Sequence, residues 1–341
     1  MSKKIKRWIS WLIGLSILLI GISFLSLTIG AVRIPFKNTM LLLMQRILFW
    51  HNSPLVSIPA SIILFKIRFP RVILGIVVGA SLSSAGVIFQ GLFRNPLVEP
   101  YTLGVSGGAA VAVCLAIMEG LSRFIPLAGF IGAIGAVVLV YFIASSGGRL
   151  AIPTLLLTGV IISFFSSSLI MLLMSISRTE ELHGIMFWIM GNLQETDFTL
   201  IIIVSIALLA GISLAFSFAR DLNALSLGEE EAIHLGTDVE RTKKILFLLA
   251  SFLTGLSVSV SGIIGFVGLM IPHLVRELID SDHRILLPAS AIFGAAFLVG
   301  ADLVARTIIT PQELPVGVIT GIAGGVIFIC IIRRRKVEFK W

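Results

Sequence analysis

Residues 79–88 read GASLSSAGVI, and residues 255–264 read GLSVSVSGII. Each stretch has two glycines seven residues apart and serines at matching places. Pro96 lies at the same offset from the first stretch as Pro272 does from the second. The chain therefore contains a pattern of small and apolar residues that occurs twice.

Composition predicts where these stretches lie. Hydrophobic residues make up 57% of the 341-residue chain, charged residues 13%, and the mean hydropathy is +1.06. Apolar runs of about 20 residues recur, and such a run spans the hydrocarbon layer of a bilayer as a helix. Because these runs are apolar on all sides, they do not alternate as the strands of a membrane barrel would. The chain is predicted to be an all-α, polytopic membrane protein with one transmembrane domain over residues 1–341.

Apolar runs and their breakers predict ten membrane-spanning helices. They cover residues 9–31, 70–91, 101–119, 126–145, 152–176, 199–218, 245–265, 268–280, 285–306 and 316–332. The eighth is short for a bilayer. The first is too long for the apolar core of a signal peptide, so we expect it to be retained.

A second pair of similar stretches, IPTLLLTGVI at 152–161 and LPVGVITGIA at 314–323, occurs in the same order as the first pair. The two pairs relate the second and fifth spans to the seventh and tenth. Because five crossings separate each pair, the copies are expected to have opposite orientations, as in the inverted repeats of many transporters. Chance similarity among small and apolar residues is the alternative.

Basic residues between the spans predict the orientation of the chain. With a cytoplasmic N-terminus, the inner side holds 17 of the 26 lysines and arginines, which favours both chain ends inside. The same bias supplies most of the net charge of +8, so nucleic-acid binding is not expected.

The most charged segment is LSLGEEEAIHLGTDVERTKK, residues 225–244, expected on the cytoplasmic side between the sixth and seventh spans. Its last two residues, both lysines, are interpreted as positive-inside anchors. The glutamates at 229–231 follow Gly228 and would form the first turn of a short helix, where the helix dipole favours negative charge, with Gly236 at its end. A solvated loop helix and a docking element for a soluble partner both fit this pattern.

The chain has few features that would supply energy for transport. Buried acidic residues, which secondary transporters commit to ions or protons, are nearly absent. Asp302 lies one helical turn before Arg306, and we expect a local ion pair there. The chain has no Gly-Lys pair, so it lacks the phosphate loop GxxxxGK[ST]. If ATP drives transport, another polypeptide must bind it, and LSLGEEEAIHLG is the expected contact.

Residues 68–109, RFPRVILGIVVGASLSSAGVIFQGLFRNPLVEPYTLGVSGGA, resemble the signature region of FecCD-type permeases. These are the membrane subunits of type II ABC importers for iron-siderophores, heme and cobalamin. Further matches occur in the family's order and cover nearly the whole chain from Arg68 onward. They are WIMG (188–191), SGIIGFVGLMIPHLVR (261–276), DHRILLPAS (282–290), ADLVAR (301–306) and ELPVGVITGIAGG (313–325). Residues 34–66 match poorly, which leaves their role open.

The resemblance implies a ten-helix subunit in the cytoplasmic membrane of a prokaryote, surrounded by lipid. It would form a homodimer, or a pseudo-dimer with a related permease, around a central pathway. Two ATP-binding subunits would lie below it and an extracytoplasmic substrate-binding protein above it. A segment of about residues 220–244 would couple the permease to the ATPase. The coupling residues implied are Gly228, Glu229, Glu230, Glu231, Ala232, His234 and Gly236.

On the outer face, the resemblance implies that Arg68, Arg71 and Arg306 bind acidic residues of the binding protein. A planar guanidinium suits this role because it can hold a carboxylate with two hydrogen bonds, although anchoring at the membrane interface is the alternative. The run RTEELHGIMFWIMGNLQ resembles the family's outer gate helix. The fifth and tenth spans line the pathway in that family, although helix packing would equally explain their polar residues. The pathway residues implied are Thr158, Ser163, Ser166 and Ser167.

The leading hypothesis is therefore the permease of a binding-protein-dependent ABC importer that carries a ferric siderophore or related iron chelate and is not itself an enzyme. Cobalamin, heme and molybdate are alternative cargoes, and an ion-coupled secondary transporter is the alternative of another class. Cys114 and Cys330 are expected to be packing residues. No cofactor or metal site is predicted, because the loop histidines have no partners at ligand spacing.

Overall fold

The computed structural model describes residues 3–47, 58–146, 149–195 and 197–334, and within these it is almost entirely helical. The helices are α1 (Lys3–Thr28), α2 (Phe36–Ile47), α3 (Ile58–Ile62), η1 (Ile63–Arg68), α4 (Phe69–Leu92), η2 (Pro100–Leu103), α5 (Val105–Met118), η3 (Ser122–Phe124), α6 (Ile125–Ala144), α7 (Ile152–Ile176), α8 (Thr179–Ile189), α9 (Phe198–Ser217), α10 (Ala219–Leu227), α11 (Glu229–His234), α12 (Val239–Ser261), α13 (Val267–Leu278), α14 (His283–Thr307) and α15 (Val316–Arg334). Two short antiparallel strands, β1 (Ser145–Ser146) and β2 (Arg149–Leu150), join α6 to α7.

Aspartate and proline mark the starts of the long helices. Asp197, Asp238 and Asp282 precede α9, α12 and α14, and each carboxylate accepts a hydrogen bond from a backbone N–H of the first turn. Those N–H groups have no partner inside the helix, so the cap satisfies them. Proline lies in the first turn of α4, α6 and α7, where its missing N–H costs nothing.

The ten predicted spans correspond to α1, α4, α5, α6, α7, α9, α12, α13, α14 and α15. Within the described residues, seven stretches are long and apolar enough to cross a membrane, and α5 and most of α15 are shorter apolar helices. The predicted eighth span is the 12-residue α13, which contains Pro272. The prediction of an all-α, polytopic membrane protein is confirmed.

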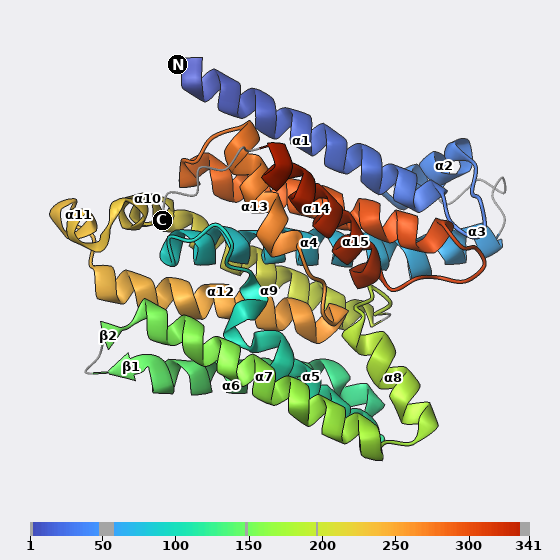
Figure 1. The fold of residues 1–341 in the computed structure, drawn as a ribbon. Coiled ribbons are helices and arrows are strands. Elements are labelled where there is room, and N and C mark those ends of the chain that lie inside the picture. The colour runs from blue at the N-terminus through green and yellow to red at the C-terminus, as the bar shows by residue number, and fades with distance from the viewer. Residues whose placement is uncertain (1–2, 48–57, 147–148, 196, 335–341) are drawn as a thin grey trace.

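The long helices run between two ends of the molecule (Figure 1). The start of α1, the helices α10 and α11, and the β1–β2 hairpin lie at one end, which we call the inner end. The helices α2, α3 and α8 lie at the other, the outer end. Helix α4 runs towards the inner end and α12 away from it, while α7 runs outward and α15 inward. The two copies of the repeat therefore have opposite orientations, as predicted.

Helix α4 forms the centre of the structure. It is buried along most of its length and packs against α9, α12, α13 and α14. A methyl group on Gly79 would collide with the carbonyl of Gly294 in α14, and one on Gly86 with the carbonyl of Gly268 in α13. Such close approach of backbones is what holds helices together in lipid, where no hydrophobic effect drives them to associate. The repeated glycines thus position the core of the fold.

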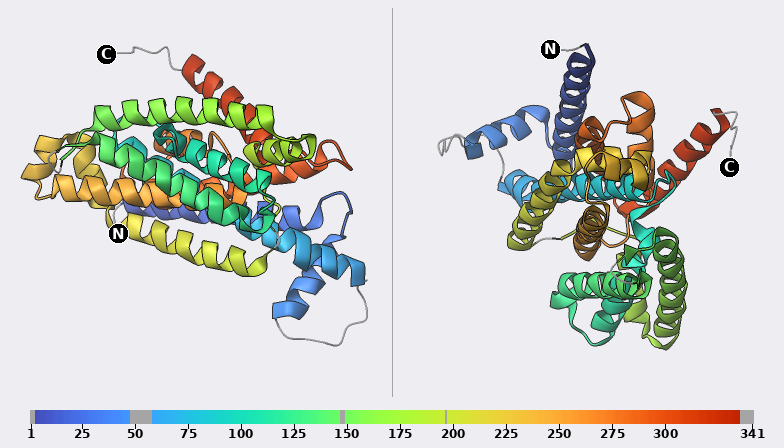
Figure 2. Two further views of the ribbon diagram at one scale, coloured as in Figure 1. Left: turned by 90° about the horizontal axis from the view of Figure 1, so that it is seen from below. Right: turned by 90° about the vertical axis from the view of Figure 1, so that its left-hand side faces the viewer.

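The helices α7 and α15 lie along the same side of the molecule (Figure 2, right). Each helix has exposed large apolar side chains. Phe164 of α7 is 73% exposed, and Ile329 of α15 is 67% exposed. In α15, neither Gly321 nor Gly325 has a described neighbour within 4 Å of the space that a methyl group would occupy. This side of the chain is therefore free to contact lipid or another subunit.

Candidate functional site

Two short helices, α10 and α11, project at the inner end between α9 and α12 (Figure 1). The predicted short helix with three glutamates in its first turn is α11. Gly228 precedes it with φ of 141°, and Gly236 follows it with φ of 84°, both in the region that favours glycine. Ala232 is buried, so the face of α11 that carries it packs against the rest of the molecule. The side chains that face solvent are Glu230, Glu231, Ile233 and His234, with Glu229 partly exposed.

A cleft of about 890 Å³ lies beside α10 at the inner end. Its walls come from α10, from the end of α4 and the chain that follows it, and from α13 with the loop before α14; the start of α1 and the chain after α11 also line it. Five cationic residues line it, against three acidic ones. The cations are Lys4, Arg94, Arg220, Arg276 and Arg284, and the acids are Asp221, Asp280 and Asp282. The cleft thus has an excess of positive charge close to the acidic helix α11.

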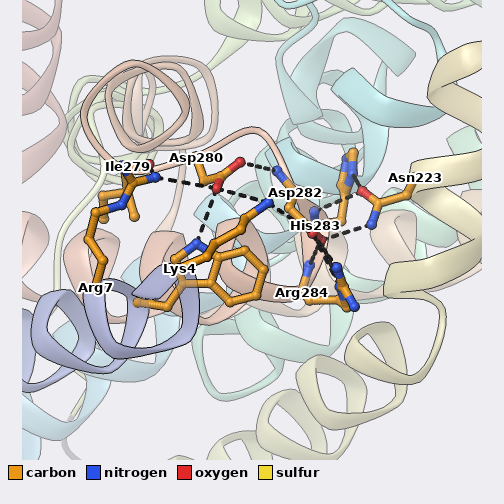
Figure 3. Close-up of polar contacts among 9 residues, drawn as sticks. Lys4, Arg7, Asn223, Ile279, Asp280, Asp282, His283 and Arg284 are labelled. Atoms are coloured by element: carbon orange, nitrogen blue, oxygen red, sulfur yellow. Dashed lines mark hydrogen bonds and ion pairs between the residues drawn. The ribbon is translucent and has the colours of Figure 1, made fainter. Parts of the chain in front are cut away.

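The loop between α13 and α14 joins α10 to α1 (Figure 3). On one side, Asn223 of α10 donates from Nδ2 to Asp282 Oδ1 at 2.9 Å and accepts at Oδ1 from the backbone N–H of His283 at 2.9 Å. On the other side, Lys4 of α1 pairs with Asp280 at 3.2 Å. A displacement of α10 will therefore act on the starts of both α14 and α1.

Both aspartates of this loop have lowered pKa values. A hydrogen bond from Arg284 lowers the pKa of Asp282 far below its ordinary range. Burial alone would raise the pKa of Asp280, but hydrogen bonds from the Asp282 backbone, Trp8 and Lys4 outweigh it and lower the pKa. The two carboxylates are therefore ionised at neutral pH, and charge-assisted contacts hold the junction together.

Lys243 at the start of α12 is a buried residue and not an anchor at the membrane surface. Its side chain is 4% exposed, and Nζ lies 3.1 Å from Glu229 Oε2 and 2.6 Å from Glu240 Oε1. The same Nζ lies 3.4 Å from the carbonyl oxygen of Leu150. The interpretation of Lys243 as a positive-inside anchor is therefore wrong, because a lysine this deeply buried needs partners that only the fold brings to it.

A cluster of four charged residues ties the outer ends of α4 and α14 to the loop before α15. Arg71 Nε lies 2.7 Å from Asp302 Oδ1, and Arg71 Nη1 lies 2.7 Å from Glu313 Oε2. Arg306 Nε lies 3.0 Å from Asp302 Oδ2, which confirms the predicted local ion pair. Burial alone would raise the pKa of Glu313, but the hydrogen bond and charge of Arg71 outweigh it and lower the pKa.

The three arginines expected to bind a partner lie together at the outer end, but inside the chain. Arg68, Arg71 and Arg306 are each at most 6% exposed. Arg68 donates to the carbonyls of Leu27 and Thr28 at 2.8 and 3.0 Å, so it holds the end of α1 against α4. In this conformation the expectation that these guanidinium groups face a partner is not met, because intrachain acceptors and packing occupy them.

The four predicted pathway residues of α7 do not share one surface. Thr158 and Ser166 are buried, and Ser163 donates to the carbonyl of Gly159 at 2.8 Å. Ser167 is the one of the four with an exposed side chain, and α7 lies on the same side of the molecule as α15 (Figure 2). The predicted outer gate helix is α8, whose Trp188 is 8% exposed and packs in the core.

The sequence argument missed several residues that the fold brings together at these sites. Asn223, Glu240 and Glu313 carried no pattern that separates them from ordinary surface polar residues. His283, expected in a loop, is the first residue of α14. Their partners lie between 59 and 242 positions away, except for the local pair of Glu240 with Lys243, and such distances leave no mark in spacing.

Comparison with known proteins identifies the family. The model of the FecCD transport family matches residues 17–334. The chain belongs to the FecCD transport family. It is accordingly a membrane permease of an ABC importer, a transport subunit in a family that the sequence motifs had indicated.

Characterised relatives of this FecCD chain import different cargoes. It is 39% identical to the hemin transport system permease HmuU of Yersinia pestis, over 95% of this chain and 95% of that protein. It is 36% identical to the cobalamin import permease BtuC of Halobacterium salinarum, over 97% and 98%. It is 34% identical to the Fe(3+)-citrate import permease YfmD of Bacillus subtilis, over 97% and 96%. The three identities are too close to one another to indicate which of these cargoes this chain carries.

A solved structure shares the fold of this FecCD chain. The protein is described as a metal-chelate type ABC transporter in an inward-facing conformation, and its chain is 32% identical to this one. The two superpose with a TM-score of 0.81, over 97% of this chain and all of the other. The arrangement of the helices is therefore that of an ABC importer permease.

Proposed function

We propose that this chain forms the homodimeric core of an importer for a ferric siderophore or a related iron chelate in the cytoplasmic membrane of a prokaryote. Two separate ATP-binding subunits would bind at the inner end, and a substrate-binding protein would deliver the cargo at the outer end. The observation that carries this proposal is the acidic helix α11 beside a cation-lined cleft, in a chain of this family that has no phosphate loop.

At the inner end, the coupling surface would consist of α11 with Gly228 and Gly236 at its two ends. The chain turns sharply at the glycines before and after α11, and the face of α11 that carries the buried Ala232 packs against the molecule. Closure of the two ATPase subunits on ATP would displace α10 and α11 as a rigid body. That displacement would reach the spanning helices through their contacts at the inner end, and the pathway would open alternately to each side.

The pathway would lie between the two copies of the chain, along the side formed by α7 and α15. The exposed Ser167 and the uncovered glycines Gly321 and Gly325 support this placement, because small residues let a second copy approach closely. Thr158, Ser163 and Ser166 would border the pathway only if α7 rotated or separated from α5. No strongly charged group of α7 faces this side, which suits a bulky chelate better than a small free ion.

At the outer end, docking would use Arg68, Arg71 and Arg306 after an exchange of partners. The side chain of Glu313 is 35% exposed and forms the accessible edge of the cluster that contains Arg71 and Arg306. A carboxylate of the binding protein could replace Glu313 at Arg71 without leaving a buried charge unpaired. Reversing the charge of Glu313 tests this step, since Glu313→Lys removes the carboxylate that competes for Arg71 and is expected to strengthen binding-protein association while the permease still assembles with its ATPase.

Purification of the permease with its partners tests the proposed function as a whole. The chain is expected to copurify with an ATP-binding polypeptide, identified by mass spectrometry, and the complex to hydrolyse ATP. Reversing the charges of Glu229, Glu230 and Glu231 together is expected to remove both association and hydrolysis. Uptake driven by an ion gradient without nucleotide would contradict the proposal.

The cargo is tested through the binding protein encoded beside this chain. A bound ligand raises the melting temperature of its binding protein in proportion to the logarithm of its concentration over Kd. Ferric siderophores or ferric citrate are expected to give the shift. A shift with cobalamin, heme or molybdate alone would leave the transport mechanism intact and replace the cargo.

A further inference from the structure

We propose that Lys243 is a positioning residue that transmits the movement of α11 to the start of α7. This inference rests on the proposed function, in which a separate ATPase moves α11. It adds to that function a route by which the movement reaches one particular spanning helix, through a single buried ammonium group.

Lys243 joins two consecutive helices, α11 and α12, to a hairpin that is distant in the sequence. It belongs to α12, while Glu229 is the first residue of α11 and Leu150 ends the β1–β2 hairpin directly before α7. The Nζ atom lies 3.1 and 3.2 Å from the two oxygens of Glu229 and 3.4 Å from the carbonyl oxygen of Leu150. The three elements also lie together at the inner end of the molecule (Figure 1).

Glu240 completes the joint from the other side. Its Oε1 lies 2.6 Å from Lys243 Nζ, and its Oε2 accepts a hydrogen bond from the backbone N–H of Leu150 at 3.1 Å. Leu150, itself 3% exposed, is therefore held at both its N–H and its C=O. The hairpin cannot shift relative to Lys243 without breaking contacts on both sides of this residue.

Burial makes this joint act as a rigid connection. A buried ammonium group that loses a carboxylate partner stays out of water, and fewer interactions then offset the free-energy cost of its desolvation. Separation of α11 from α12 would cost Lys243 its contact with Glu229, and separation of the hairpin would break the bonds at Leu150. The least costly response to a push on α11 is that α11, the start of α12 and the hairpin move together.

This route is distinct from the one through Asn223. That second connection leads from α10 to Asp282 and His283, and from there to α14 and α1. The Lys243 joint leads to α7, the helix on the proposed pathway side. Loss of Lys243 should therefore uncouple α7 while it leaves the ATPase bound to the permease.

Spin-label distances in the assembled complex test the inference. Ala151, at the start of α7, is exposed and accepts a label as Ala151→Cys in a background with Cys114→Ser and Cys330→Ser. In the dimer, the two labels report the separation of the two α7 helices. With Lys243 intact, this separation is expected to change when ATP and vanadate trap the closed ATPase.

Lys243→Met is expected to abolish most of that change while the complex continues to hydrolyse ATP. The matched control is Lys244→Met, which removes a partly exposed neighbouring lysine and should leave the distance change intact. Lys243→Arg keeps the charge and should restore the movement. If Lys243→Met does not fold, Glu240→Ala removes the acceptor of the Leu150 backbone N–H, keeps the pair of Lys243 with Glu229 and should likewise uncouple α7.

The outcomes separate this inference from the proposed function. A complex with the native Lys243 that binds no ATPase, or hydrolyses no ATP, contradicts the proposed function. A normal distance change in Lys243→Met or in Glu240→Ala overturns the role of the joint and leaves the proposed function standing. Equal loss of movement in Lys243→Met and Lys244→Met would also overturn it, because the effect would then follow surface charge.

Discussion

Replacing Asp302 by asparagine should destabilise the permease strongly, because two buried arginines depend on this carboxylate. Asp302 is 2% exposed and lies 2.7 Å from Arg71 and 3.0 Å from Arg306. After the substitution Arg71 would keep Glu313, whereas Arg306 would keep only its hydrogen bonds to Ser26. Breaking a buried ion pair by removing one partner typically costs about 3–5 kcal/mol. We expect Asp302→Asn to lie in that range, with most of the cost at Arg306.

The assay is unfolding of the purified permease in mixed micelles, followed by circular dichroism. The matched control is Glu313→Gln, since Glu313 pairs with Arg71 at the same distance of 2.7 Å but its side chain is 35% exposed. A pair that water reaches contributes about 1 kcal/mol or less, so the control should unfold close to the unsubstituted protein. The double variant Asp302→Asn with Arg306→Met should recover part of the loss. Equal effects of Asp302→Asn and Glu313→Gln would refute the argument from burial.

Two further predictions concern the core and the inner junction. Gly86→Leu should prevent correct assembly because its side chain would collide with the carbonyl of Gly268. Gly135→Leu should be tolerated, because a side chain at Gly135 has no described neighbour within 4 Å. The yield of monodisperse protein is measured for both variants. The pKa values of Asp280 and Asp282 are lowered, so their stabilisation of the α1 junction is complete above the ordinary aspartate pKa of about 4 and is lost as pH falls through the lowered values. Hydrogen exchange in the first turns of α1, corrected for intrinsic rates, should therefore stay constant from about pH 8 to about pH 5 and increase only at lower pH. Loosening that begins near neutral pH would contradict this.

Apolar run length and breakers predicted the spans well, because a bilayer permits few alternatives to a helix of the right length. The starts of α9, α12 and α14 coincide with aspartate caps that are visible in the sequence. The glycine repeat also indicated the core, since Gly79 and Gly86 lie at close backbone contacts in α4. These features depend on residues within a few turns of one another.

Contacts between distant segments could not be predicted in this way. Lys243 resembles any lysine at a membrane boundary, and only the fold brings Glu229 and Leu150 to it. The outer arginines named by the family motif lie together, but the burial of Arg68 and Arg306 depends on contacts with the end of α1 that no spacing in the sequence indicates. The inner cleft likewise arises from segments that are distant in the sequence and whose side chains have no common spacing.

The central claim is that a separate ATPase drives this permease through α11. A photo-crosslinking amino acid at Ile233, which is 62% exposed on α11, tests it most directly, with Ile308, 60% exposed at the outer end, as the matched position. In the membrane of intact cells, the account predicts that Ile233 crosslinks to a polypeptide identified as an ATP-binding subunit and that Ile308 does not. Crosslinking of that subunit from Ile308, or labelling of Ile233→Cys by a membrane-impermeant thiol reagent added outside, would contradict it.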